Sequence, residues 1–485
     1  MRGNEIILGA SSPVHIAKAD RLLAADHPTR TDDLISRFER IPFSGWHRRA
    51  RITMGTATFL DAFDALSLAF VLPVLVKLWS LTPADIGWLI AASYIGQLVG
   101  ALLFSRLAEA YGRVPSAAAA TAIMSVMSLG CVFAGSFPLL FVCRLIQGIG
   151  VGGEMPVAAA YISELSRAEG RGRFFMLYEM IFPVGLMVTG QVGTILVPMF
   201  GWQSLFLIGG IPGLILAFIL FRLPESPRWL IAKGRLEEAD AAISNAERSA
   251  VKTYPDFKPQ APYTPVVPES SALKDTPNPS ERGRWMELLS PVFRARTVIA
   301  WALWACAFFV ANSLNNWMPT LYHTVYNLDL ATSLRAASMT NVAQVIILLV
   351  CAFCIDRIGR RNWAVASFVI GALLLAALAF GAKDNLVMVI VLATLAYGIV
   401  GSVNAVLYLY TPEIYPTRMR ALGTGIATSW LRLASAVGPA LVGYMVSREG
   451  IGAVFVMFAI VAAIGALAAS QMIETRGRKL EDIAS

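Results

Sequence analysis

A series of long apolar runs constrains this chain more than any other feature of its sequence. A helix needs about 20 predominantly apolar residues to cross a hydrocarbon core of about 30 Å. Lipid offers no hydrogen-bond partners, so the backbone N–H and C=O groups of a crossing segment must hydrogen-bond to one another, as they do in a helix. The runs predict an all-α membrane protein with twelve transmembrane helices, at residues 52–76, 84–107, 115–134, 137–163, 174–199, 203–222, 297–322, 333–355, 362–380, 385–411, 421–446 and 451–474.

Composition excludes several other classes of protein. Hydrophobic residues make up 56% of the 485 and charged residues only 15%, too few to cover a water-exposed surface. The net charge of +8 does not indicate a nucleic-acid partner, because no Lys/Arg cluster is interleaved with aromatic residues. The five cysteines fall in apolar segments, so we expect no disulfide framework and no metal site at Cys351 and Cys354. No nucleophile with a base and no phosphate-binding loop stands out, so we expect neither an enzyme nor a cofactor.

Basic residues are distributed unequally between the loops on the two sides of the membrane. One side holds Arg48, Arg49, Arg51, Arg106, Arg113, Arg167, Arg171, Arg173, Arg357, Arg360, Arg361, Arg418, Arg420, Arg476, Arg478 and Lys479. The opposite loops hold Lys77, Arg335, Lys383 and Arg448. Because cytoplasmic loops carry the excess of Lys and Arg, both termini are predicted to be cytoplasmic and the protein to lie in the cell inner membrane. The first 46 residues contain no long apolar run, so no cleavable signal peptide is expected.

Short motifs recur at offsets of 247 to 249 residues, which indicates two parallel copies of a six-helix unit. Gly112 and Arg113 recur as Gly359 and Arg360, and Glu164 recurs as Glu413. Within the connecting segment, residues 235–249 are predicted to form an amphipathic helix that could lie flat under the membrane, and residues 253–279 to be flexible. The predicted organisation is a cytoplasmic segment 1–51, bundles at 52–222 and 297–474, a cytoplasmic linker 223–296 and a tail 475–485.

The loop motifs at residues 105–113 and 352–361 resemble those between helices 2 and 3, and 8 and 9, of the major facilitator superfamily. The first copy departs from the pattern, with Ser105 for Gly, Glu109 for Asp and Ala110 for Arg, which implies a weaker charge latch in that half. Residues 224–230, 161–164 and 411–420 resemble the sugar-porter, organic-ion and synaptic-vesicle-protein-like branch. Residues 40–49, 61–64 and 150–156 are similar to bacterial proton-linked carriers of aromatic acids and niacin. The resemblance implies two bundles that rock around one central site.

Acid and arginine pairs at the helix ends are predicted to act as a gate. Such pairs can bridge the two halves when one side is closed, and they must separate when it opens, so they bias a two-state equilibrium. The alternative is that they only anchor helices at the lipid headgroups. The candidates are Glu109, Arg113, Glu164, Arg173, Glu225, Arg228, Asp356, Arg357, Arg360, Glu413 and Arg420.

Ionisable residues inside the spans indicate proton coupling, because a charge near the bilayer centre is costly unless it is paired or lines a wet cavity. Counting ~1.5 Å per residue, Asp61 and Asp64 lie about 14 and 18 Å into their span. Arg144 lies at a similar depth, so it can pair with Asp64 and release it during transport. A permanently locked structural pair is the alternative. Glu154 and Glu179 are further proton-site candidates, although a helix-packing hydrogen bond explains them equally well.

Arg432 is predicted to bind the substrate. By the same counting it lies about 16 Å into its span, with no acid in that helix, and a guanidinium there can grip a carboxylate by two parallel hydrogen bonds. Pairing with Asp61 or Asp64 is the alternative. Aromatic residues that could stack on a flat ring, or simply pack, are Trp301, Trp430, Tyr178, Tyr397 and Tyr408.

These features predict a monomeric secondary transporter that binds a small molecule and protons within the lipid bilayer. Proton-coupled symport of an organic anion, such as nicotinate or a benzoate, is the leading interpretation. A sugar, polyol, organic-cation or drug transporter remains open, as does a non-transporting membrane binding protein of the synaptic-vesicle type.

Overall fold

The computed structural model describes residues 30–165, 180–259, 285–382 and 385–476, and these residues form helices without a strand. Eleven helices of the described chain are long and apolar enough to cross a membrane. They are α3 (Gly45–Trp79), α4 (Pro83–Tyr111), α5 (Arg113–Val132), α6 (Phe137–Leu165), α8 (Ile181–Phe200), α9 (Gln203–Leu220), α12 (Arg294–Thr324), α13 (Leu330–Ile358), α14 (Arg360–Ala377) with the π-helical turn η3 (Leu378–Ala382), α15 (Leu386–Glu413) and α17 (Ile451–Ser470).

The remaining predicted span corresponds to α16 (Thr417–Arg448), which is 32 residues long. Its length suffices to cross a bilayer, but it is more polar than the others and has Arg432 halfway along it. The fold class predicted from the sequence is confirmed. The expected division at residues 52, 223, 297 and 475 stays a prediction.

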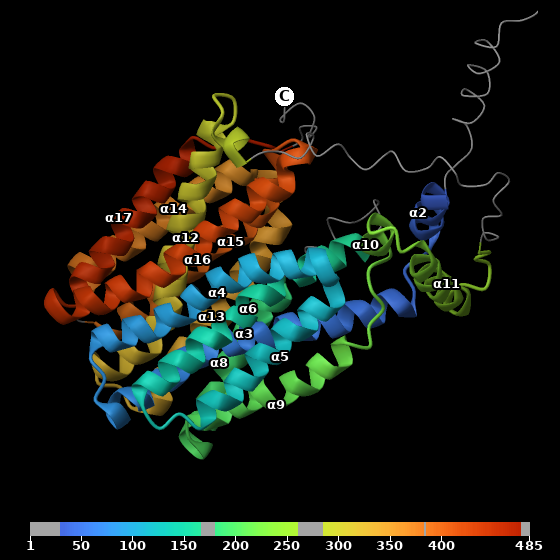
Figure 1. The fold of residues 1–485 in the computed structure, drawn as a ribbon. Helices are drawn as coiled ribbons and strands as arrows, with labels where there is room; N and C mark the ends of the chain where they lie inside the picture. The colour runs from blue at the N-terminus through green and yellow to red at the C-terminus, as the bar shows by residue number, and fades with distance from the viewer. Residues whose placement is uncertain (1–29, 166–179, 260–284, 383–384, 477–485) are drawn as a thin grey trace, which may run out of the picture. The chain divides into compact units, whose positions relative to one another are not determined.

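The two halves repeat one packing pattern, in keeping with the repeated motifs. In the first half α4 and α5 pack on α6, and α5 packs on α9; in the second half α13 and α14 pack on α15, and α14 packs on α17. Figure 1 shows α3 to α9 and α12 to α17 as two adjoining groups of helices. Contacts of α4 with α16 and of α8 with α13 join the groups.

Two glycines make the tight turns that join α4 to α5 and α13 to α14. Gly112 has φ +117° and Gly359 has φ +93°, a region that side chains disfavour. A Cβ at Gly112 would overlap the Glu225 carboxylate, and one at Gly359 would lie 2.8 Å from the Glu474 carboxyl carbon. Each turn therefore needs glycine for its conformation and for the close approach of an acid. We call the end of the bundle that holds these turns the motif end.

A second compact unit consists of residues 1–48 and 227–276, of which α2 (Arg30–Arg40), α10 (Pro227–Ala232) and α11 (Leu236–Thr253) are described. The buried Arg37 of α2 bonds Glu247 at 2.8 Å and Asp240 at 2.7 Å, both on α11. The hydrogen bonds that Arg37 donates to these acids raise its pKa, the one to Glu247 most strongly, although burial of the guanidinium opposes the shift. The predicted amphipathic helix exists as α11, and it packs on α2 and α10. That it lies flat under the membrane stays a prediction.

Candidate functional site

Two aspartates of α3 lie in the interior of the bundle, and one of them has no hydrogen-bond partner among the described residues. Asp61 is 1% exposed, and neither of its carboxylate oxygens is bonded within the described chain. The charges that act on it most strongly are Glu154, Asp64 and Arg432. An uncompensated buried carboxylate is costly, so Asp61 is suited to hold a proton or to meet a cationic or hydrogen-donating group.

Both carboxylate oxygens of Asp64 accept hydrogen bonds, in contrast to those of Asp61 one turn earlier. Its carboxylate accepts hydrogen bonds from Ser128 Oγ at 3.0 Å and from Gln147 Nε2. Arg144 donates to Gln147 Oε1 at 2.7 Å and to the Asp64 backbone carbonyl at 3.3 Å. The structure therefore brings Arg144 beside Asp64 as predicted, but the expected direct ion pair is replaced by a contact through Gln147. Glu154, also of α6, accepts a hydrogen bond from Thr58 Oγ1 at 3.1 Å.

Arg432 lies opposite this acidic group, in the second half, and its guanidinium is only partly bonded. It is 8% exposed, donates from Nη1 to the Thr428 carbonyl at 3.2 Å, and has an unpaired Nε within the described residues. Asp61 is the acid whose electrostatic attraction acts on it. No ion pair within 4 Å joins Arg432 to Asp61 or Asp64 in the part of the chain that the structure describes.

Aromatic rings lie along α12, α15 and α16 in the same half. Trp301 and Trp430 stack, with centroids 5.6 Å apart and planes at 29°, and the buried Trp301 Nε1 has no acceptor in the described parts of the chain. Tyr408 lies edge-on to Trp304, at 4.7 Å between centroids. Tyr397 donates to Gln344, with Asn341 Oδ1 at 3.4 Å, so it is held by an amide cluster rather than by other rings.

Charged residues at the motif end form one network in each half. In the first half Arg113 pairs with Glu164 at 3.0 Å, and Glu225 accepts hydrogen bonds from the backbone N–H groups of Val114 and Ser226. Burial raises the pKa of Glu225, although these backbone hydrogen bonds oppose the shift.

The second half repeats this arrangement. Arg360 pairs with Glu413 at 3.5 Å and with Asp356 at 3.0 Å, and Glu474 accepts hydrogen bonds from the backbone N–H groups of Arg360 and Arg361. Both networks join residues of one half. In this structure each arginine pairs with the glutamate of the neighbouring helix in its own copy of the repeat. That such pairs bridge the two halves when this end is closed stays a prediction.

The remaining gating candidates differ in their surroundings. Arg357 is exposed and makes no ion pair within the described chain, and Glu109 is exposed on the last turn of α4. Arg228 bonds Glu39 within the smaller unit. Candidates that lie outside the described residues are Arg173, Tyr178, Glu179 and the side chain of Arg420.

Several polar residues of the interior escaped the sequence analysis. Gln147 is one turn after Arg144, and that spacing was the only indication that it could join the pair. Glu474 follows Glu225 by 249 residues, so the repeat itself could have revealed it. Asn316 Nδ2 donates to the Tyr94 hydroxyl at 3.1 Å and thereby joins α12 to α4, a pairing that no sequence pattern indicates. The described residues contain no group of three side chains that could hold a metal ion.

Comparison with known proteins identifies the family. The sequence model of the family described as "Sugar (and other) transporter" matches residues 56–485. The chain belongs to this family. The transporter is 32% identical to the niacin transporter NiaP of Acinetobacter baylyi over 453 residues, which are 93% of this chain and 99% of that protein. It is 25% identical to the 4-hydroxybenzoate transporter PcaK of the same organism, over 84% of this chain and 87% of the relative.

The solved structures confirm the fold. The xylose transporter XylE from E. coli, in a partially occluded inward open conformation, matches with a TM-score of 0.68 at 19% identity, over 90% of this chain and all of that one. The resemblance to the major facilitator superfamily, and to its aromatic-acid and niacin branch, is thus confirmed. The chain is a multi-pass membrane transporter of a small molecule, and it is not an enzyme.

Proposed function

We propose that the transporter carries a small aromatic or heteroaromatic carboxylate together with protons, by alternating access between its two halves. The niacin and 4-hydroxybenzoate transporters among its relatives support this substrate class. In this proposal the protein is a monomer of the inner membrane with both termini in the cytoplasm, as the distribution of basic residues favours.

The observation that carries the proposal is the incompletely bonded guanidinium of Arg432 halfway along a membrane-spanning helix. A buried cation without a full set of acceptors is costly, and a carboxylate on the substrate supplies two acceptors in the geometry that a guanidinium fork matches. Trp301 of α12 stacks on Trp430 of α16, the helix that carries Arg432, and the pair offers apolar, flat rings to an aromatic substrate.

The proton part of the proposal rests on Asp61 and Asp64. Asp61 is buried and makes no hydrogen bond to any residue that the structure describes, and its attraction to Arg432 links its protonation to whatever neutralises that arginine. A substrate carboxylate on Arg432 removes the positive charge that favours ionised Asp61, so substrate and proton are expected to bind together. Asp64, with its bonds to Ser128 and Gln147, is the second site of the pair.

A binding titration on the purified transporter tests this function. The ligands are nicotinate, benzoate, their neutral amides and a sugar, measured by thermal shift or calorimetry. Losing one partner of a buried ion pair costs about 3 to 5 kcal/mol, so the amides are expected to bind more than a hundredfold more weakly than the acids. Arg432→Ala should lose the carboxylates while remaining folded, and Arg432→Lys should restore little because the bidentate fork is gone.

A control with the same change of charge is Arg448→Ala, at the exposed end of the same helix, which should bind the acids as the wild type does. Equal binding of acids and amides by the wild type would contradict the proposal.

A sugar or polyol is the second candidate, and one cluster of side chains favours it. Tyr397, Gln344 and Asn341 form a buried amide and phenol group of the kind that bonds hydroxyls. If the sugar alone stabilises the protein and Arg432→Ala leaves that effect unchanged, this candidate replaces the carboxylate.

A further inference from the structure

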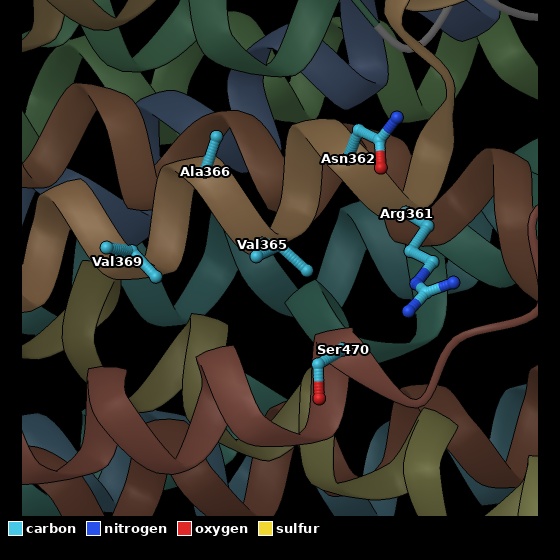
Figure 2. Close-up of a pocket in the computed structure, with 6 residues that line it drawn as sticks. All are labelled: Arg361, Asn362, Val365, Ala366, Val369 and Ser470. Atoms are coloured by element: carbon cyan, nitrogen blue, oxygen red, sulfur yellow. The ribbon is translucent and has the colours of Figure 1, made fainter.

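A groove lies on the outer surface of the second half, at the motif end. Its volume is about 490 Å³, and it is lined by Arg361, Asn362, Val365, Ala366 and Val369 of α14 and by Ser470, the last residue of α17. Figure 2 shows Arg361 and Val365 extending from α14 toward the end of α17 that carries Ser470. One end of the groove is therefore cationic and polar, and the rest of it is apolar.

Arg361 is the cation of this groove. The Arg361 guanidinium makes no hydrogen bond or ion pair within the described residues. The nearby acid, Glu474, is occupied by the backbone N–H groups of Arg360, Arg361 and Arg476. Asn362 uses one N–H of its amide on the Ile358 carbonyl, at 3.2 Å, and keeps the other. The polar end of the groove thus presents spare donors to an anion.

The apolar part of the groove continues along the membrane-facing surface. Val365, Val369 and Leu373 succeed one another at intervals of four residues on α14, and Leu373 is 65% exposed. On α17, Leu467 is 70% exposed and Ile464 49%. In a helix that crosses the bilayer such exposed side chains face acyl chains, so an apolar track leads away from Arg361 into the membrane.

The depth of Arg361 places it at the headgroups. It is the second residue of a membrane-crossing helix of 21 residues, Arg360–Phe380, whose length is about 30 Å and matches the hydrocarbon core. A basic pocket between membrane helices at this depth suits a lipid phosphate, while the track beneath it suits a chain of the same molecule.

We infer that this groove binds an anionic phospholipid, with its phosphate on Arg361 and Asn362 and an acyl chain along Val365, Val369 and Leu373. A lipid with a net negative charge is favoured over phosphatidylcholine, whose own cation partly neutralises the phosphate that Arg361 would bind. The site is separate from Arg432 and from both aspartates, so it does not depend on the substrate.

The test compares lipid binding to the full chain in detergent by native mass spectrometry. Phosphatidylglycerol and phosphatidylcholine with the same acyl chains are titrated against the wild type, Arg361→Gln and Arg222→Gln. Arg222 is the matched control, because it is an exposed arginine just after α9, the counterpart of α17 in the repeat. One arginine near the membrane surface contributes about 1 kcal/mol to anionic lipid binding, so the wild type should prefer phosphatidylglycerol about fivefold.

The preference for phosphatidylglycerol over phosphatidylcholine should disappear in Arg361→Gln and persist in Arg222→Gln. A second variant, Val369→Trp, fills the groove without changing the charge and should weaken the first bound phosphatidylglycerol as well. Glycerol 3-phosphate, which has a headgroup but no acyl chain, should not displace the lipid. The inference is overturned if the wild type shows no preference, if both arginine variants lose it equally, if Val369→Trp binds as the wild type does, or if glycerol 3-phosphate competes.

Discussion

Replacing Gly443 by alanine is expected to force apart α4 and α16 at the end of the bundle opposite the motif end. A Cβ at Gly443 would overlap the Pro83 carbonyl oxygen and lie 3.3 Å from Gly87 Cα. A Cβ at Gly87 would lie 2.8 Å from the Pro439 carbonyl oxygen. These neighbours are backbone atoms, which cannot turn aside as a side chain can, so the two helices must separate.

Gly425 offers a matched control on the same helix, because a Cβ there meets nothing within 4 Å. Alanine at either position improves helix propensity by about 1 kcal/mol. Overpacking at Gly443 alone costs about 1 to 3 kcal/mol. The free-energy difference between the closed and open forms of this end should therefore differ between the two variants by about 1 to 3 kcal/mol. This corresponds to a change of about 5- to 150-fold in the ratio of closed to open forms.

Spin labels at Ala84 and Ser447, both exposed at this end, report the separation of the two helices in a background without native cysteines. Gly443→Ala should shift the distance distribution to longer values and slow uphill uptake, whereas Gly425→Ala should match the parent in both. Identical distributions for the two variants would refute the reasoning. So would a loss of global stability in Gly443→Ala without any change in distance, because the contact would then be a packing contact and not a gate.

Three further outcomes are expected. Asp64→Asn should abolish accumulation driven by a pH gradient while substrate exchange across equilibrated membranes survives at least in part, and normal uphill uptake would contradict its role in coupling. Glu474→Ala should lower the free energy of unfolding by about 1 to 2 kcal/mol, because the first N–H groups of α14 lose their acceptor, and a thermal melt beside the exposed Glu449→Ala measures this. Burial raises the pKa of Glu225, so its contribution to stability is present at low pH and declines as pH rises through the folded pKa. As the pH rises above about 4.5, the wild type should therefore lose more stability than Glu225→Gln, and parallel pH curves would count against this.

The apolar runs and the repeated motifs determine the architecture without reference to any contact. A run of about 20 apolar residues has one stable form in lipid, a helix, because every other backbone conformation leaves polar groups unbonded. The offset of 247 to 249 residues likewise predicts that both halves pack alike, as α5 on α9 and α14 on α17 do. Arg432 and Asp61 could be singled out for the same reason, since lipid makes any buried charge exceptional.

The partners of those charges were decided by the tertiary structure alone. Depth along a helix placed Arg144 level with Asp64, but the rotation of each helix about its axis determines that Gln147 comes between them and that Asp61 is left unbonded. Sequence spacing does not predict that rotation, and it does not predict that α12 packs near α4, where Asn316 donates a hydrogen bond to Tyr94. It also could not show that the acid and arginine pairs close within each half, or that α11 packs on α2 through Arg37. Helix formation is local and follows from residue type, whereas partner choice depends on side chains that are far apart in the chain and meet only when the helices pack.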